Sequence, residues 1–399
     1  MRILLIAPHC PSPADMGIKT HLAFVLRSLA ARHTVEVVGF FASASEQWEW
    51  RRIAGEWGFG LRELIPLRQG WGLAVERAQS LLSGEPIGVA HYRGPRVVRA
   101  LAKALATNPD WVIYDYYPTL EAQLLSRQIP SLLLPVDCYS LYYQRLSRSA
   151  PGWAGRWKAG WLSRRFARWE ARVYPQLTAV APVGQVDAAE LRRLAPSANI
   201  QVLPVASPAL PRHKPGAIPR VLVGGAFWMP AVAADAIAFL RYWQTGHWQP
   251  APAELVVWGR GAPPALEAAT VAAGGTYVDW VDDYDAFLAS GDIYVYPQRA
   301  AAGLQTKVQQ AMSAGLAVVA APEILEALEV DSDWPAVAVQ GAAAMAAATL
   351  DLVRDPRRRE AIGAAAREHI GRHFSPDLVH ATLNQLLTLP SLQLEETHA

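Results

Sequence analysis

The sequence predicts an α/β protein of two domains, each built on a parallel sheet. Its 399 residues exceed the size at which one hydrophobic core stops growing. Short apolar runs alternate with longer segments of helical period, which is the pattern of strands joined by helical crossovers. That alternation stops once, near residue 205, and then restarts. Because ligands of open parallel sheets bind at the carboxyl ends of the strands, we expect a substrate in a cleft between two such domains.

Five apolar runs supply the strands expected in the first half. Between the first two, apolar residues recur at helical spacing from Leu22 to Leu29, which predicts a helix packed on the sheet as a crossover. The predicted strands are RILLIA (2–7), VEVVGFF (35–41), WVIYD (111–115), SLLLPV (131–136) and TAVAPV (178–183).

A proline-rich segment separates the two halves. Residues 203–220 hold five prolines and show no periodicity, as expected of an interdomain linker. We therefore expect four parts: an N-terminal domain over 1–205, a linker over 206–219, a C-terminal domain over 220–375, and a C-terminal helix over 376–399 that returns to the N-terminal domain.

The second half shows the same alternation of apolar runs and helical segments. Its tail, from about residue 352 to residue 379, is predicted to be a helix, a glycine break and a second helix. The predicted strands are RVLVGG (220–225), AELVVWG (253–259), TYVDWV (276–281), DIYVYP (292–297) and LAVVAA (316–321).

Composition excludes several classes of protein. The net charge of +2 is too small for a typical nucleic-acid binder, so we expect no nucleic-acid partner. Cys10 and Cys138 lack zinc-site spacing, and the DSD run at 331–333 is a weak match to a metal motif, so no metal is expected. The first residues form a predicted strand in place of a signal peptide, and no apolar run approaches membrane-spanning length. The expected location is the cytoplasm.

The stretch GLQTKVQQAMSAGLAVV (303–319) predicts a phosphate-binding turn and helix. A helix is expected from about Gln305 to residue 314, where Gly315 ends it, and free N–H groups at its start favour an anion. Lys307 adds a positive charge one turn in, and Arg299 in the preceding loop adds a second. Together they suit a diphosphate, with Gly303 allowing close backbone approach. The alternative is a solvated Lys and Arg on an ordinary loop and helix.

Candidate acids and bases lie in the first half. Asp115 and Asp137 each follow a predicted strand, where a carboxylate could accept the proton of an acceptor hydroxyl. Each could equally be a loop cap or turn residue. His9 follows the first strand and could touch substrate, whereas His21 is expected on a helix surface.

Long segments of the chain resemble GT-B glycosyltransferases of the family-4 type. The resemblance is strong in YVYPQRAAAGLQTKVQQAMSAGLAVVAAPE (294–323), in the strands and helix over 254–297, and in the tail over 352–377. It is moderate in ILLIAPHCPSPADMGIKTHLAFVLRSLAARHTVEVV (3–38). The pattern GxQxKxxxAMxxG looks most like bacterial exopolysaccharide sugar transferases.

The resemblance implies two Rossmann-like domains facing across a cleft, with a nucleoside-diphosphate sugar held mainly by the C-terminal one. It implies transfer with retention of configuration, without a metal or other cofactor, to a glycan, lipid-linked or small-molecule acceptor. Lys307 would meet the diphosphate, aided by Arg299, and Asp137 or Asp115 would serve the acceptor. The implied donor site comprises Gly225, Val278, Trp280, Gly303, Leu304, Gln305, Thr306 and Gln310, and the implied cleft loop holds His9, Gly17 and Lys19.

The chain departs from the family pattern at three places. Ala302 and Gln310 stand where the family often has two glutamates, and Gly225 and Ala226 stand where many relatives carry an arginine. A glutamine can still accept from a ribose hydroxyl, but it loses a charge-assisted bond worth roughly 1 kcal/mol. Two alternatives therefore remain: a weakened or inactive relative that binds a nucleotide sugar or partner, and a GT-B sugar-nucleotide epimerase.

Residues 145–174 combine tryptophan with positive charge. The segment holds eight Arg or Lys and one acid, Glu170. A helical wheel places a core stripe from Leu162 to Val173 opposite a face of tryptophans and arginines, although Gly155 and Gly160 are expected to interrupt the helix. Such a face suits peripheral contact with an anionic membrane, a polyanionic glycan or a lipid-diphosphate acceptor. The alternative is a solvated basic helix whose tryptophans pack beneath a loop.

Overall fold

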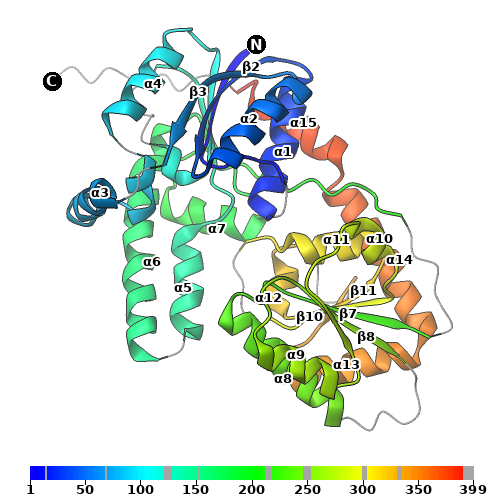
Figure 1. Ribbon diagram of the computed structural model, residues 1–399. Helices are drawn as coiled ribbons and strands as arrows, with labels where there is room; N and C mark the ends of the chain where they lie inside the picture. Colours follow the sequence, from blue (N-terminus) through cyan, green and yellow to red (C-terminus); the bar gives the residue numbers. More distant parts are fainter. Residues whose placement is uncertain are drawn as a thin grey trace. The chain divides into compact units, whose positions relative to one another are not determined.

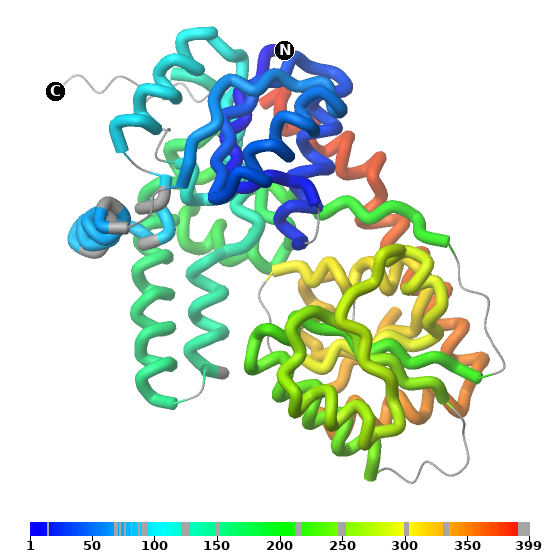
Figure 2. The backbone as a smooth tube through the Cα atoms, viewed as in Figure 1, coloured from blue at the N-terminus to red at the C-terminus, as the bar shows by residue number. Residues whose placement is uncertain are grey.

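The computed structural model divides the chain into two compact units. Unit 1 comprises Met1–Val205 together with Val379–Ala399, and unit 2 comprises Ala206–Leu378. Figure 1 and Figure 2 trace the chain through both. The residues that the structure describes are 1–13, 16–67, 70–92, 94–120, 128–150, 152–211, 218–245, 253–298, 303–329 and 335–389.

Unit 1 is built on a six-stranded parallel sheet with the order β3-β2-β1-β4-β5-β6. Helices α4, α6 and α7 pack on one face, where Val97, Phe166 and Leu191 join the core formed with the strands. The strands are β1 (Arg2–Ala7), β2 (Thr34–Phe41), β3 (Gly60–Pro66), β4 (Trp111–Asp115), β5 (Ser131–Leu134) and β6 (Ala179–Val180). The helices are α1 (Gly17–Ala30), α2 (Ala44–Trp57), α3 (Gly70–Ser83), α4 (Pro95–Leu105), α5 (Tyr139–Ser149), α6 (Trp153–Val173) and α7 (Gln185–Leu194), with 3-10 turns at Ile87–Tyr92 and Tyr174–Gln176.

Unit 2 is built on a second six-stranded parallel sheet, with the order β12-β11-β10-β7-β8-β9. Helices α8, α9 and α13 cover one face and α10, α11 and α14 the other (Figure 1). The strands are β7 (Arg220–Gly224), β8 (Glu254–Trp258), β9 (Thr276–Val278), β10 (Ile293–Tyr296), β11 (Ala317–Ala320) and β12 (Val337–Ala338). The helices are α8 (Pro230–Thr245), α9 (Pro264–Ala272), α10 (Tyr284–Ala289), α11 (Thr306–Ala314), α12 (Pro322–Glu326), α13 (Ala342–Arg354) and α14 (Pro356–His373), and α15 (Pro376–Leu386) follows.

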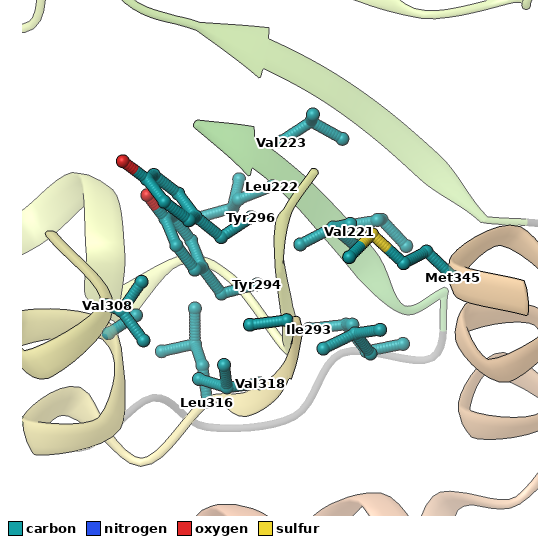
Figure 3. Packing of buried hydrophobic residues seen from close by; sticks show 14 of the residues in the cluster. Val221, Leu222, Val223, Ile293, Tyr294, Tyr296, Val308, Leu316, Val318 and Met345 are labelled. Atoms are coloured by element: carbon teal, nitrogen blue, oxygen red, sulfur yellow. The ribbon is translucent and has the colours of Figure 1, made fainter. Parts of the chain in front are cut away.

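The core of unit 2 fixes the position of α11. Figure 3 shows the side chains of β7 and β10 packed with Val308 of α11, Val318 of β11 and Met345 of α13. These side chains are almost completely buried. Burial of a large aliphatic side chain contributes about 1.5–3 kcal/mol, so this packing holds the start of α11 firmly beside the ends of the strands.

The predicted α/β architecture of two parallel sheets is confirmed, and the differences lie at the edges of the sheets. Strand β3 was missed because it is an edge strand with an alternating, half-exposed pattern instead of an apolar run. Strand β12, of two residues, was missed because it is too short to form a pattern. The strand predicted over 178–183 shrinks to two residues, Ala179–Val180, at the other edge of the first sheet.

Three predicted glycine breaks are wrong. Helix α6 continues through Gly155 and Gly160, and α14 runs from Pro356 to His373 through Gly363. A glycine in a helix interior costs about 1 kcal/mol, which the tertiary packing of a long helix readily exceeds. Helix α6 packs along α5 as a helical hairpin (Figure 1), and Gly363 lies so close to Gly315 that a Cβ atom there would stand 2.0 Å from the Gly315 carbonyl oxygen.

Candidate functional site

Lys307 is the central cation of the candidate site in unit 2. It lies in the first turn of α11, and its Nζ donates a hydrogen bond to the carbonyl oxygen of Gly225 at 3.3 Å. The same Nζ lies 4.4 Å from the ring centroid of Trp258, the last residue of β8. Burial lowers the pKa of Lys307 to about 8, and no carboxylate among the described residues pairs with it. The arrangement is a half-buried cation held by a carbonyl and an aromatic ring.

The start of α11 leaves backbone donors beside this cation. Gln305 is the N-cap residue, but its side chain caps no N–H group, because its Oε1 accepts from the hydroxyl of Tyr296 at 2.7 Å. The first intrahelical bond runs from the N–H of Val308 to the carbonyl of Gln305. The N–H groups of a first helical turn that lack such bonds attract anions. Gly303 has φ +68°, a left-handed conformation that disfavours a side chain and sets the turn before the helix.

Loops after β7, β8 and β9 form the wall next to Lys307. Gly259 has φ +145°, and a Cβ atom there would lie 2.1 Å from the Gly225 carbonyl oxygen, so only glycine permits this approach. The N–H of Gly259 donates to the carbonyl of Val278, and the N–H of Trp228 donates to the carbonyl of Arg260. These bonds tie the three loops into one rigid edge.

Two exposed indoles and a guanidinium lie on that edge. The guanidinium of Arg260 lies 3.9 Å from the ring centroid of Trp280, whose Nε1 donates to Asp282. Trp280 and Trp228 are each more than half exposed. Solvent-exposed aromatic faces held by neighbours are surfaces on which a planar base can stack.

Gln310 is half-buried one turn beyond Lys307, and its side chain forms no hydrogen bond with another described residue. Leu304 packs against the core of unit 2, and Thr306 is the first residue of α11. The structure therefore brings Gly225, Gly303, Thr306, Lys307 and Gln310 to one end of the sheet. Arg299, Ala302 and the DSD run at 331–333 lie outside the described residues.

In unit 1 the predicted acids lie at the ends of two adjacent strands. Asp115 ends β4 and is completely buried, with neither carboxyl oxygen bonded to a described residue, and burial raises its pKa well above the usual value. Asp137 is half-buried just after β5. The residue after Asp115, Tyr116, has φ +71°, and the residue before Asp137, Val136, has φ +67°. Such angles are rare, above all for a β-branched residue, and they cluster where structure is constrained for function.

Three carboxyl groups gather at the start of α5. Asp187 of α7 accepts the N–H of Cys138 at 2.7 Å, and Glu170 of α6 accepts the N–H of Tyr139 at 2.9 Å. Burial raises the pKa of Glu170 to about 7, and burial together with the neighbouring Asp187 raises the pKa of Asp137. Glu170 and Asp187 thus cap free N–H groups of α5, whereas no described residue donates a hydrogen bond to the Asp137 carboxylate.

His9, Gly17 and Lys19 lie near the start of unit 1. His9 is half-buried, 6.0 Å between ring centroids from Tyr116, and burial followed by the charge of Lys19 lowers its pKa. Gly17 is the first residue of α1, and Lys19 lies in its first turn. His21, expected on a helix surface, is instead completely buried in α1. Among the described residues, no group of three His, Cys, Asp or Glu side chains could hold a metal ion.

Sequence reasoning missed Trp258, Arg260, Trp228, Glu170 and Asp187. The position of Trp258 and Arg260 directly after a buried strand was the available signal, because such residues lie at the ligand-binding edge of a parallel sheet. No local signal marks Glu170 or Asp187, because their partners in α5 lie about thirty to fifty residues away in sequence.

The fold matches that of solved GT-B glycosyltransferases. HepE of Anabaena, in complex with UDP, matches with a TM-score of 0.67 and 13% identity over 97% of this chain and 99% of that one. Sucrose-phosphate synthase of Thermosynechococcus elongatus matches with a TM-score of 0.68 and 15% identity over 97% and 98%. A glycosyltransferase of Rickettsia africae matches with a TM-score of 0.66 and 12% identity over 98% and 99%. The predicted GT-B fold is confirmed.

The C-terminal part carries the match to a protein family. Residues 218–355 match the family model described as glycosyl transferases group 1. This match and the solved structures confirm the predicted resemblance to GT-B glycosyltransferases, while the family-4 type and the exopolysaccharide-like subtype stay predictions. A search of curated proteins found no sequence match.

Proposed function

We propose that the protein transfers a sugar from a nucleoside-diphosphate sugar to a hydroxyl of a glycan, lipid-linked or small-molecule acceptor. The match of residues 218–355 to the glycosyltransferase family model and the GT-B fold of the whole chain support sugar transfer. We further propose that transfer retains the anomeric configuration and needs no metal or cofactor. Positive charge from protein side chains would then replace a metal at the leaving diphosphate.

The observation that carries this proposal is Lys307. Its ammonium group is half-buried beside the N–H groups that open α11, and its present contacts are a neutral carbonyl and the face of an indole. A desolvated cation without a carboxylate is costly, and an incoming diphosphate would relieve that cost. Negative charge develops on the leaving diphosphate during transfer, so a fixed cation there stabilises the transition state more than the bound donor.

The other donor-site residues take complementary roles in the proposal. The base lies against the loop from Val278 to Trp280, where the Arg260–Trp280 pair offers a rigid aromatic surface. Gln310 accepts from a ribose hydroxyl, and Gly303 leaves room for the sugar. Anabaena HepE has been solved with UDP and with UDP-glucose, so uridine nucleotides are the first probes to use here.

In unit 1, Asp137 is the base we propose for the acceptor hydroxyl. Asp137 is a half-buried residue that follows the constrained Val136, whereas Asp115 is completely buried. Burial and Asp187 raise the pKa of Asp137, which suits a group that must take up a proton near neutral pH. His9, Gly17 and Lys19 complete the acceptor side of the proposal.

Calorimetric titration with UDP, GDP and their sugars tests the proposal first, followed by a hydrolysis assay without acceptor. We expect micromolar to millimolar binding of one nucleotide class and slow release of sugar whose anomer, read by NMR, matches the donor. An inverted product would exclude the retaining mechanism. Binding without turnover under any acceptor would support a nucleotide-sugar binding protein, and no nucleotide binding would remove the proposal altogether.

The proposed setting is the cytoplasm. In the part of the chain that the structure describes, no helix has the length and apolar content to cross a bilayer. If the described part of the chain contacts a membrane, we therefore expect it to lie on the membrane surface and not to cross the bilayer.

A further inference from the structure

Helix α6 presents a continuous stripe of tryptophan and arginine to solvent. Because the helix is unbroken, Trp153, Trp157, Arg164, Arg168 and Arg172 fall within about a third of its circumference. All five side chains are exposed, Trp153 to 78% and Trp157 to 64%. At about 1.5 Å per residue the stripe is roughly 28 Å long.

The opposite face of α6 packs into unit 1. Phe166 and Trp169 are buried in the core, and Ala159 is buried on the same side. The outward direction of the stripe is therefore fixed by core packing, not by the choice of an exposed rotamer. Trp161 lies on the same side of the helical wheel as the stripe but is half-buried, and the centroid of its ring lies 5.1 Å from the guanidinium carbon of Arg165.

The exposed charge of the α5–α6 hairpin has one sign. The sequence from Tyr139 to Val173 holds eight basic residues and one acid, Glu170. Glu170 belongs to α6 and is completely buried where it accepts the N–H of Tyr139, the first residue of α5. No described carboxylate forms an ion pair with Arg164, Arg168 or Arg172. These three arginines are therefore available to anions from outside the molecule.

Helix α3 adds a second exposed apolar face to the same unit. Trp71, Val75 and Leu82 recur at positions that share one side of a helix, and they are 88%, 54% and 88% exposed. An amphipathic helix ordinarily buries this side. Exposed apolar side chains that gather on one helix face mark a surface for a protein or a membrane.

Arg165 attaches the end of α3 to the middle of α6. Its guanidinium donates hydrogen bonds to the carbonyl oxygens of Ser80 and Glu85, at the end of α3 and just beyond it. On the helical wheel Arg165 lies next to the exposed stripe, between Trp161 and the buried face. The end of α3 therefore borders the stripe, and the two exposed faces belong to neighbouring elements.

We propose that the stripe on α6 and the outward face of α3 form a docking surface for an anionic lipid bilayer. Arginines attract the anionic headgroups, and tryptophans prefer the boundary between headgroups and acyl chains. A soluble anionic polysaccharide would account for the arginines but not for Trp71, Val75 and Leu82, which have no charge to offer it. None of the residues of this surface belongs to the proposed donor or acceptor site, so the docking proposal does not rest on the transfer activity.

Flotation of the full-length protein with phosphatidylcholine vesicles, with and without phosphatidylglycerol, tests this surface. We expect binding only with phosphatidylglycerol, weakened by salt. Replacing Arg164, Arg168 and Arg172 with Gln should weaken binding about a hundredfold, since each cation near an anionic surface contributes about 1 kcal/mol, or roughly a factor of five. The double variant Trp153→Ala, Trp157→Ala should lose about tenfold, and Trp71→Ser with Leu82→Ser a similar factor.

Matched variants control for charge and for aromatic content. Changing Arg96, Arg99 and Lys103 of α4 to Gln removes the same charge from another exposed helix, and Trp48→Ala removes an exposed indole from α2. Both should bind vesicles as the unaltered protein does, and thermal melts should show that every variant folds. Equal losses in the α4 variant, equal binding to neutral vesicles, or binding to heparin without binding to vesicles would each overturn the proposal.

Discussion

The two sheets share one architecture but place opposite chemistry at the ends of their strands. In unit 2 the ends of β7 and β8 surround Lys307, a cation whose contacts are a carbonyl oxygen and an aromatic ring. In unit 1 the ends of β4 and β5 carry Asp115 and Asp137, and two further carboxylates cap α5 nearby. Both regions contain groups with strongly shifted pKa values.

The shifted groups of the two units differ in whether they already have hydrogen-bond partners. Glu170 and Asp187 accept hydrogen bonds from backbone N–H groups of unit 1, so their raised pKa values accompany a structural role. Lys307 has a carbonyl in place of a counter-ion, so its lowered pKa reflects a charge that still lacks an anion. A perturbed pKa is therefore a sign of a functional site only when the partner is missing.

The largest expected effect comes from removing the Lys307 charge. Lys307→Ala should lower turnover about a hundredfold or more, as loss of one preorganised group facing developing charge does. Thermal unfolding should shift little, because among the described residues the ammonium group makes one 3.3 Å hydrogen bond and one contact with an aromatic ring. Steady-state kinetics with saturating donor measure the effect, and a rate near that of the unaltered enzyme would remove Lys307 from the site.

In unit 1 the comparison predicts a loss of stability in place of a loss of rate. Glu170→Ala leaves the N–H groups of Tyr139 and Ser140 without an acceptor and should reduce the free energy of unfolding by about 2–4 kcal/mol. Glu170→Gln keeps an acceptor oxygen and should lose less. Glu368→Ala, which removes only an exposed ion pair, should change it by less than about 1 kcal/mol. Urea unfolding measures all three; similar values for Glu170→Ala and Glu368→Ala would contradict the capping role.

The pH dependence of UDP binding tests the charge of Lys307 without a mutation, and the expected effect is smaller than that of Lys307→Ala. The pKa of the free side chain is about 8, and a bound diphosphate would raise it. Above about pH 7, where the terminal phosphate of UDP is largely ionised, affinity should stay level up to about pH 8 and fall as the pH rises further, because the free lysine then loses its proton before binding. Lys307→Arg keeps its charge throughout and should abolish this fall. Calorimetry across the range measures it, and a flat profile for the unaltered protein would show that the charge is not used.

The smallest expected effect concerns ribose. Gln310→Glu restores a charge-assisted hydrogen bond and should tighten UDP binding by roughly 1 kcal/mol. The gain should persist with uridine, which has the ribose but no phosphate, whereas the effect of Lys307→Ala should vanish with uridine. Gln310→Ala is the control and should not tighten binding. A gain seen with UDP alone would place residue 310 at the phosphates.

Much of this fold follows from local pattern. Buried strands such as Arg2–Ala7 and Trp111–Asp115 were predicted to the residue, since a central parallel strand is apolar on both faces. Helix α11 and its end at Gly315 followed from the position of a glycine with φ +85°. The edge strand Gly60–Pro66 was not predicted, because its exposed side chains interrupt the apolar run.

The site could be predicted only in part, for a physical reason. The chemical type of Lys307 and its place at a helix start are local properties of the sequence, so they could be read directly. Its contacts with Gly225 and Trp258 depend on the order of β7, β8 and β10 in the sheet, which brings together residues about fifty to eighty positions apart. The constrained angles at Tyr116 and Val136 have no local signal, since neither residue type favours them.

Helix α15 has a consequence for the folding of the chain during its synthesis on the ribosome. The chain leaves unit 1 after Val205 and re-enters it at Val379, and Val379, Leu383 and Leu386 are buried there. Unit 2 is therefore synthesised in full before unit 1 has received its last core residues. The sheet of unit 1 must therefore wait until α15 has been synthesised to complete its packing, although its strands precede unit 2 in the chain.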